Sequence, residues 1–323
     1  MPRLMPSRVQ RAGSSKPLPA RTKIDTRSAL EFGVVTLVWG STWLVIKGQL
    51  GVVPPAWSVS YRFLIAAAVL FAICLVTRRW QRPTAAAHGF AAIAGAMQFM
   101  LNFNLVYVAE GHLTSGLVSL VFALLVVPNA VLARVFLNTR ISLRFATGAA
   151  IGVAGLALVF ADDVFAATGR SAAVGLGLTV AAVLCASTAN VMQASPLART
   201  LPPLPTLTLT MAYGAVFDCV YALATVGRPT IDLRPEYWLG LVYLAVFATV
   251  VAFTLYYRLI RRIGPGPAAY SSVVVPIVAM TLSTVFEDYR WTLTGAGGAI
   301  LAVAGLAVAL AARQTAEPTL PVS

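Results

Sequence analysis

Apolar runs, each as long as a membrane-crossing helix, follow one another from residue 28 almost to the end of the chain. A helix needs about 20 apolar residues to cross a bilayer. The runs are about twice as long as a barrel strand and do not alternate apolar with polar residues, so they predict helices. Only 11% of the residues are charged, against about a quarter in soluble domains. We therefore expect an all-α integral membrane protein with ten spans, at 28–49, 55–77, 86–108, 112–134, 142–161, 172–194, 204–227, 235–258, 266–287 and 292–313.

The 24 lysines and arginines lie mainly in the connections between spans. If the N-terminus is cytoplasmic, 18 of them lie inside and four outside, with Lys47 and Arg62 left within spans. Because basic residues favour the cytoplasmic side, we expect both termini inside a cell inner (plasma) membrane. Residues 1–27 are predicted to be a disordered basic cytoplasmic tail, and residues 314–323 a second cytoplasmic tail. The net charge of +13 thus reflects membrane topology, and we expect no nucleic-acid partner.

Cysteine and histidine usage gives no sign of a metal or haem site. Cys74, Cys185 and Cys219 all lie inside apolar runs without a CxxC pair, and His88 and His112 are far apart in the sequence. We expect no disulfide, metal or cofactor.

The chain repeats itself at an offset of 150 residues. Residues 135–159 align with 285–309 without a gap, and twelve of these 25 pairs are identical. The same offset pairs Phe103 with Phe253 and Tyr107 with Tyr257. The sequence therefore predicts two five-helix repeats, at 28–161 and 172–313.

Five is an odd number, so the second repeat enters the membrane from the opposite side to the first. The predicted architecture is an inverted repeat around a central cavity, an arrangement that in transporters supports alternating access. Spans five and ten carry Gly148 with Gly152 and Gly298 with Ala302, small-residue faces that allow close helix contact and are interpreted as scaffold.

Several motifs together resemble the EamA family of the drug/metabolite transporter superfamily. They are Trp39-Gly40-Ser41-Thr42-Trp43 in the first span, Pro54-Pro55 ahead of Arg62, Pro128 and Pro276 in the fourth and ninth spans, and the glycine-rich fifth and tenth spans. The resemblance covers about residues 30–312 and implies ten helices in two inverted repeats, a central cavity and export of small metabolites such as amino acids without ATP. The chain departs from the family where a glutamate usually follows the fourth span, because Leu137-Asn138-Thr139-Arg140 stands there, while Glu287 lies near the equivalent turn of the second half.

Aromatic and cationic candidates for substrate binding lie in the first two spans. Trp39 and Trp43 are four residues apart and share a helix face, so they are predicted to line the cavity, with lipid-facing packing as the alternative. Arg62 lies about two turns from the outer end of the second span, where its guanidinium could bind a substrate carboxylate. The alternative for Arg62 is a structural pairing with Glu110 or with backbone carbonyls. Lys47, at the end of the first span, is interpreted as a snorkelling anchor.

Amide side chains inside the spans are further candidates, because unpaired amides cannot face hydrocarbon cheaply. Gln98, Asn102 and Asn190 are predicted to contact substrate, with hydrogen bonding between helices as the alternative. Tyr257 is a further candidate for substrate binding, as an aromatic gate; the alternative is ordinary packing between helices. Pro128 and Pro276 interrupt helical hydrogen bonds and are predicted hinges.

Asp218 is predicted to couple transport to protons. It is the carboxylate nearest the middle of a span, fourteen residues past Leu204, and intramembrane ionisable groups are functional hypotheses by default. The alternative to proton coupling is that Asp218 has a structural role and hydrogen-bonds between helices. The chain has no Walker motif to supply ATP drive, which leaves an ion gradient as the source of accumulation.

Other classes of function are weighed against the exporter. An enzyme is not expected: Asp162-Asp163 lacks the second half of a DDxxD pattern, and no HExxH or GxSxG motif is present. A receptor, a channel and a multidrug or lipophilic-cation exporter remain alternatives. The expected partners are a small-molecule substrate and membrane lipid, and a homodimer is left open.

Overall fold

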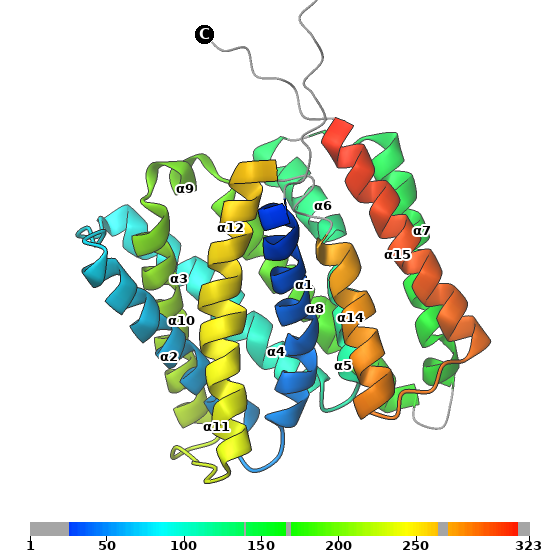
Figure 1. The fold of residues 1–323 in the computed structure, drawn as a ribbon, viewed down its shortest axis with the longest axis horizontal. Coiled ribbons are helices and arrows are strands. Elements are labelled where there is room, and N and C mark those ends of the chain that lie inside the picture. The colour runs from blue at the N-terminus through cyan, green and yellow to red at the C-terminus, as the bar shows by residue number, and fades with distance from the viewer. Residues whose placement is uncertain (1–25, 139, 166–168, 264–270, 316–323) are drawn as a thin grey trace, which may run out of the picture.

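The computed structural model describes residues 26–138, 140–165, 169–263 and 271–315, and these form a bundle of helices (Figure 1). No strand occurs among these residues. Nine of the described helical segments are long and apolar enough to cross a membrane, and α14 is a shorter apolar helix of 16 residues. The predicted all-α membrane fold is confirmed. The count of ten spans stays a prediction, since residues 264–270 before α14 fall outside the described ranges.

The helices follow the predicted apolar runs closely. Their bounds are α1 Thr26–Gly48, α2 Pro55–Val76, α3 Ala85–Gly95, η1 Ala96–Leu101, α4 Asn102–Ala109, α5 Ser115–Ala123, α6 Val126–Leu137, α7 Leu143–Phe165, α8 Gly169–Gln193, α9 Pro196–Thr200, α10 Pro203–Thr225, α11 Pro235–Val242, η2 Tyr243–Val251, α12 Ala252–Ile263, α14 Ser271–Phe286 and α15 Leu293–Thr315.

Local sequence explains where several helices begin. Pro55, Pro203 and Pro235 each occupy the first position of a helix, where the missing N–H costs nothing and the fixed φ angle suits the helix. Thr84 caps α3 by accepting a hydrogen bond from the backbone N–H of Ala87 at 3.2 Å. Loop chemistry thus divides the apolar runs into separate helices.

Positions 150 residues apart share unusual backbone conformations. The third and eighth runs each contain a π-helix, at Ala96–Leu101 and Tyr243–Val251. Asn138 and Asp288, also 150 residues apart, adopt left-handed φ angles of 53° and 54°. Both are residue types that tolerate this region. These matches support the predicted duplication, whose boundaries remain a prediction.

Helices α7 and α15 lie side by side at one edge of the bundle (Figure 1). Their contact is made through glycines, because a Cβ atom added at Gly148 or Gly305 would overlap the backbone of the facing helix. The small-residue faces predicted for the fifth and tenth spans therefore pack against each other, as close helix contact requires.

We expect Gly305→Ala to destabilise the protein by about 1–3 kcal/mol, as overpacking of a tight contact does. The new methyl group would meet the backbone nitrogen of Gly152 on α7. Gly297→Ala is the matched control on the same helix, since nothing lies within 4 Å of a Cβ at Gly297. There the better helix propensity of alanine adds up to about 1 kcal/mol. Thermal unfolding in detergent measures both, and an equal response of the two variants would contradict this packing.

Candidate functional site

A cavity of about 500 Å³ lies among the helices. Its walls are formed by residues of α1, α2, η1, α4, α5, α6, α8, η2, α12, α14 and α15. Its volume is within the range of small-molecule sites. At one end of the bundle α1 begins and α15 ends, and we call this the terminal end; the opposite end, where α1 ends and α2 begins, is the far end.

The cavity is closed at the far end. The lining residues toward that end are at most 3% exposed: Ile46, Arg62, Val106 and Ser119. Asn190 also lines the cavity, and its side chain is exposed. It lies three residues before α8 ends at the terminal end. Within the described residues, the cavity therefore opens toward the terminal end.

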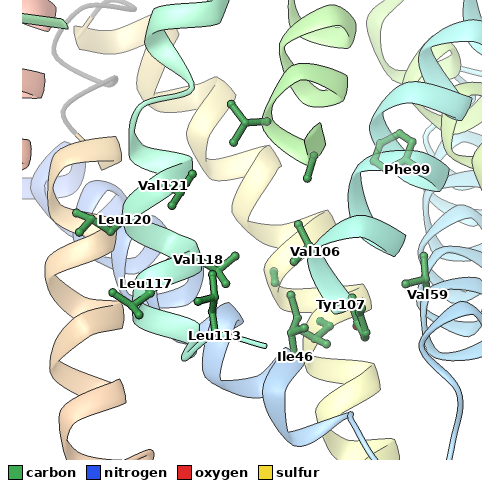
Figure 2. Close-up of a cluster of buried hydrophobic side chains, with 14 of the residues drawn as sticks. Ile46, Val59, Phe99, Val106, Tyr107, Leu113, Leu117, Val118, Leu120 and Val121 are labelled. Carbon is green, nitrogen blue, oxygen red and sulfur yellow. The ribbon is translucent and has the colours of Figure 1, made fainter. Parts of the chain in front are cut away.

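Apolar side chains seal the far end beneath the cavity. Figure 2 shows Ile46 of α1, Val106 and Tyr107 of α4, and Leu113 and Val118 of the adjoining segment gathered in one buried cluster. None of these five side chains is more than 5% exposed. Because protein interiors pack densely, these side chains close the cavity at the far end.

The two predicted tryptophans line the cavity and belong to aromatic pairs. The ring centroid of Trp39 lies 5.4 Å from that of Phe253 and 5.0 Å from that of Tyr256, and its Nε1 donates to the carbonyl oxygen of Ala248 at 3.1 Å. The Trp43 ring lies 5.0 Å from Phe122. Both tryptophans are thus fixed by neighbours, which makes them rigid walls.

Arg62 supplies the positive charge of the cavity. Its side chain projects from α2 and its Cζ atom lies 4.5 Å from the centroid of the Phe103 ring, a cation–π distance. Its Nε and Nη1 atoms are buried without a hydrogen-bond partner in the part of the chain that the structure describes. The predicted alternative, an ion pair with Glu110, does not form between these two described residues. Arg62 therefore keeps unused donors beside the cavity.

Amide groups add hydrogen-bonding capacity to the walls. The side-chain oxygens of Gln98, Asn102 and Asn129 are buried and accept no hydrogen bond from any described residue. The side-chain nitrogen of Asn102, by contrast with its oxygen, has a partner: it donates to the backbone carbonyl of Gln98 at 3.2 Å. Buried amides are normally satisfied, so these oxygens are positioned to accept from a ligand.

The structure gathers most of the predicted binding residues in this one cavity. Trp39, Trp43, Arg62, Gln98, Asn102 and Asn190 all line it, as does the predicted hinge Pro276. The side chain of Tyr257 lies outside the described residues. Its neighbour Tyr256 lines the cavity. The roles assigned to these residues remain predictions.

Pro128 and Asp218 are absent from the described walls of the cavity. Pro128 is the third residue of α6, just after the break that separates α5 from α6. Asp218 lies on α10, fully buried, and its Oδ1 accepts from Asn104 Nδ2 at 2.7 Å. Asn104 is on α4, the helix that brings Phe103 to the cavity, so Asp218 contacts the wall from behind.

Sequence reasoning did not select several of the lining residues. Phe103, Phe122, Phe253, Ser119 and Asn129 all face the cavity. A signal was present for two of them, because Phe103 and Phe253 are 150 residues apart and both reach the cavity. Phe122, Ser119 and Asn129 carry no such mark in an apolar run.

The described part of the cavity wall contains one charged residue. Among the described lining residues only Arg62 carries a charge, and no aspartate or glutamate is included. In the described part of the chain, no group of three His, Cys, Asp or Glu side chains is placed to hold a metal ion. The site is thus an aromatic and amide cavity with one cation at its closed end, suited to bind a ligand with a negative group.

Comparison with known proteins gives a consistent family. The EamA-like transporter family matches residues 30–161 and 173–311. Protein PagO of Salmonella typhimurium is 24% identical over 80% of this chain and 83% of its own length. The "Probable amino-acid metabolite efflux pump" of Escherichia coli is 24% identical over 84% of this chain and 91% of its own. The "Uncharacterized inner membrane transporter YedA" of Escherichia coli is 25% identical over 77% and 79%, respectively.

Among solved structures, one crystal structure illustrates the shared fold. It superposes with a TM-score of 0.61 at 20% sequence identity, over 87% of this chain and 96% of the other. This likeness concerns the arrangement of the helices alone.

Proposed function

Because the chain belongs to the EamA-like transporter family, we propose that it is a secondary carrier that exports small carboxylate-bearing metabolites, amino acids or related compounds first among them, by alternating access. Family membership makes the chain a multi-pass membrane transporter of small molecules rather than an enzyme. Beyond family membership, we propose the class of substrate and the direction of transport.

The observation that carries the proposal is the charge of the cavity. Arg62 is the only charged residue among the described lining residues, and two of its nitrogens have no partner among the described groups. A guanidinium binds a carboxylate with two parallel hydrogen bonds. The free oxygens of Gln98, Asn102 and Asn129 and the nearby aromatic faces would accept the ammonium group of an amino acid.

Export of a lipophilic cation is the alternative. The contacts of Trp39 with Phe253 and Tyr256 provide aromatic faces that attract cations. The charge of Arg62 opposes this alternative, because a like charge in a low-dielectric cavity repels the ligand. Arg62 thus makes a carboxylate the better fit.

The distribution of basic residues supports the proposed direction of transport. With 18 lysines and arginines on the side of the termini and four on the other, the terminal end is assigned to the cytoplasm. The cavity then opens inward, which is the state in which an exporter loads its substrate. Its opposite state follows from the proposed inverted repeat, in which the two halves exchange conformations.

Counterflow in proteoliposomes tests the proposed function. Vesicles preloaded with an unlabelled amino acid should take up the labelled compound transiently, with saturation. Carboxylate-bearing analogues should compete, and the corresponding decarboxylated amines should not. Counterflow of tetraphenylphosphonium without any response to amino acids would overturn the proposal in favour of the cation exporter, and a flux that does not saturate would indicate a channel.

A further inference from the structure

The turn of residues 110–114, which joins α4 to α5 at the far end, is held from one side by Lys47. The Nζ atom of Lys47, next to the end of α1, donates to the backbone carbonyl of Glu110 and to that of Leu113 at 3.0 Å. The carbonyls at the end of a helix have no helical partner and carry negative partial charge. The cation therefore ties α1 to the turn, where a snorkelling side chain was expected.

Glu287 holds the other side of the same turn. Its Oε1 and Oε2 accept from the backbone N–H of Ser115 at 3.2 and 3.1 Å, and Oε2 also accepts from Ser115 Oγ at 2.5 Å. Ser115 is the first residue of α5, and an anion is favourable at a helix N-terminus. Glu287 follows α14, so this contact joins segments from the two proposed halves of the chain.

The carboxyl group of Glu110 lies buried at this turn. Glu110 is fully inaccessible, and both of its carboxylate oxygens lack a hydrogen-bond donor among the described residues. Its position in a loop was expected from the sequence, whereas its burial was not. An ionised carboxylate without donors is costly to bury, so the surroundings favour its neutral form.

The charged and titratable groups near Glu110 come from every neighbouring element. They are Lys47 of α1, Glu287 after α14, Arg62 of α2 and Tyr107 of α4. Burial raises the pKa of Glu110 well above its ordinary value; Lys47 lowers it, Glu287 raises it and Arg62 lowers it, each by less than burial does.

We propose that Lys47, Ser115 and Glu287 form a latch that holds the α4–α5 turn shut at the outer end of the carrier, and that Glu110 binds a proton from the outer side when this latch closes. The inference rests on the alternating access proposed above. When the halves part at this end, Glu287 leaves Ser115 and water reaches Glu110, which then ionises beside Lys47 and Arg62. Closure removes that water, and the carboxylate takes up one proton to become a neutral carboxylic acid.

The pH dependence has a definite sign. The pKa of Glu110 is higher in the closed state than in a hydrated open state. Protonation therefore stabilises the closed state fully below the open-state pKa, and this stabilisation is lost as pH rises through the closed-state pKa. Acid closes the latch and alkali opens it.

Spin-label distances across the latch test this inference without any substrate. The spin labels are attached at two exposed positions, His112 on the turn and Arg290 after α14. They are introduced as His112→Cys and Arg290→Cys in a background free of the three native cysteines. We expect the distance distribution to move from short to long as the buffer is changed from acidic to alkaline. Replacing His112 also removes the histidine on the turn from the titration.

Three variants separate the parts of the proposal. Glu110→Gln should keep the short distance at every pH, because its side chain stays neutral. Glu287→Ala should give the long distance even in acid, because the tie to Ser115 is lost. Glu236→Gln, an exposed acid at the same end of the bundle, is the matched control and should respond as the parent protein does.

The results distinguish this inference from the proposed function. A distance that does not change with pH in the parent protein, or a Glu110→Gln variant that still responds, would overturn the latch even if amino-acid counterflow is observed. Conversely, a pH-dependent distance without amino-acid counterflow would support the latch and contradict the proposed substrate. If Glu110→Gln fails to fold, the parent titration and Glu287→Ala still decide whether the latch exists.

Discussion

Replacing Arg62 by glutamine should weaken binding of a carboxylate substrate about 10- to 100-fold, because glutamine keeps one amide donor and loses one charged hydrogen bond, which contributes about 1.5–3 kcal/mol. Arg62→Lys keeps the charge and loses the planar pair of donors, so its effect should lie between glutamine and the parent. The half-saturation concentration in counterflow and the dissociation constant in detergent measure both variants. Binding of the decarboxylated analogue should not weaken and should if anything improve, because the like charge that repels its ammonium group is removed; this separates loss of the carboxylate contact from misfolding.

Arg228→Lys is the matched control for this series, since Arg228 lies exposed in the connection between α10 and α11. Trp39→Ala should weaken binding of carboxylate and amine alike, because it removes the ring packed on Phe253 and Tyr256. Unchanged binding in Arg62→Gln at equal membrane abundance would mean that Arg62 serves the structure alone.

Asp218→Asn is expected to abolish accumulation driven by a pH gradient while leaving counterflow largely intact. Asn104 already donates to Asp218 Oδ1, and Oδ2 has no hydrogen-bond partner among the described residues, so an asparagine of the same shape fits the site. The variant lacks the proton that the carboxylate would carry. Uptake into proteoliposomes under an imposed pH gradient, compared with counterflow in the same vesicles, measures the difference.

Asp288→Asn is the matched control for this substitution. Asp288 is exposed and has a left-handed φ angle of 54°, which asparagine also tolerates. It should leave both activities unchanged. If Asp218→Asn still concentrates substrate under the gradient, Asp218 is a structural residue, and Glu110 becomes the first group to test for proton coupling.

Helical periodicity gives expectations for the parts of the candidate site that depend on one helix at a time. Trp39 and Trp43 share a face because they are four residues apart, and both line the cavity. The 150-residue repeat pairs Phe103 with Phe253, and both reach the cavity. It did not indicate that their shared position faces a ligand rather than the core.

Glu110 and Asp218 show where reading along the chain fails. Hydropathy assigns Asp218 to a span and Glu110 to a loop, and both placements along the chain are right. Nevertheless Asp218 lies behind the cavity wall, and Glu110 is completely buried beside Lys47 and Arg62. Whether a loop residue is buried depends on how the neighbouring helix ends meet, and no local pattern records that.

The sequence by itself determined that this chain is an all-helical membrane protein, where its helices run and which polar groups must avoid lipid, because the cost of placing backbone and charge in hydrocarbon acts on each segment separately. Only the tertiary structure decided that Arg62 is the one charged group among the described residues that line the cavity, and that Lys47, Glu287 and Glu110 meet at one turn. These relations join residues from helices far apart in the sequence. They arise from the angles and contacts at which whole helices pack, which side chains from both partners set together.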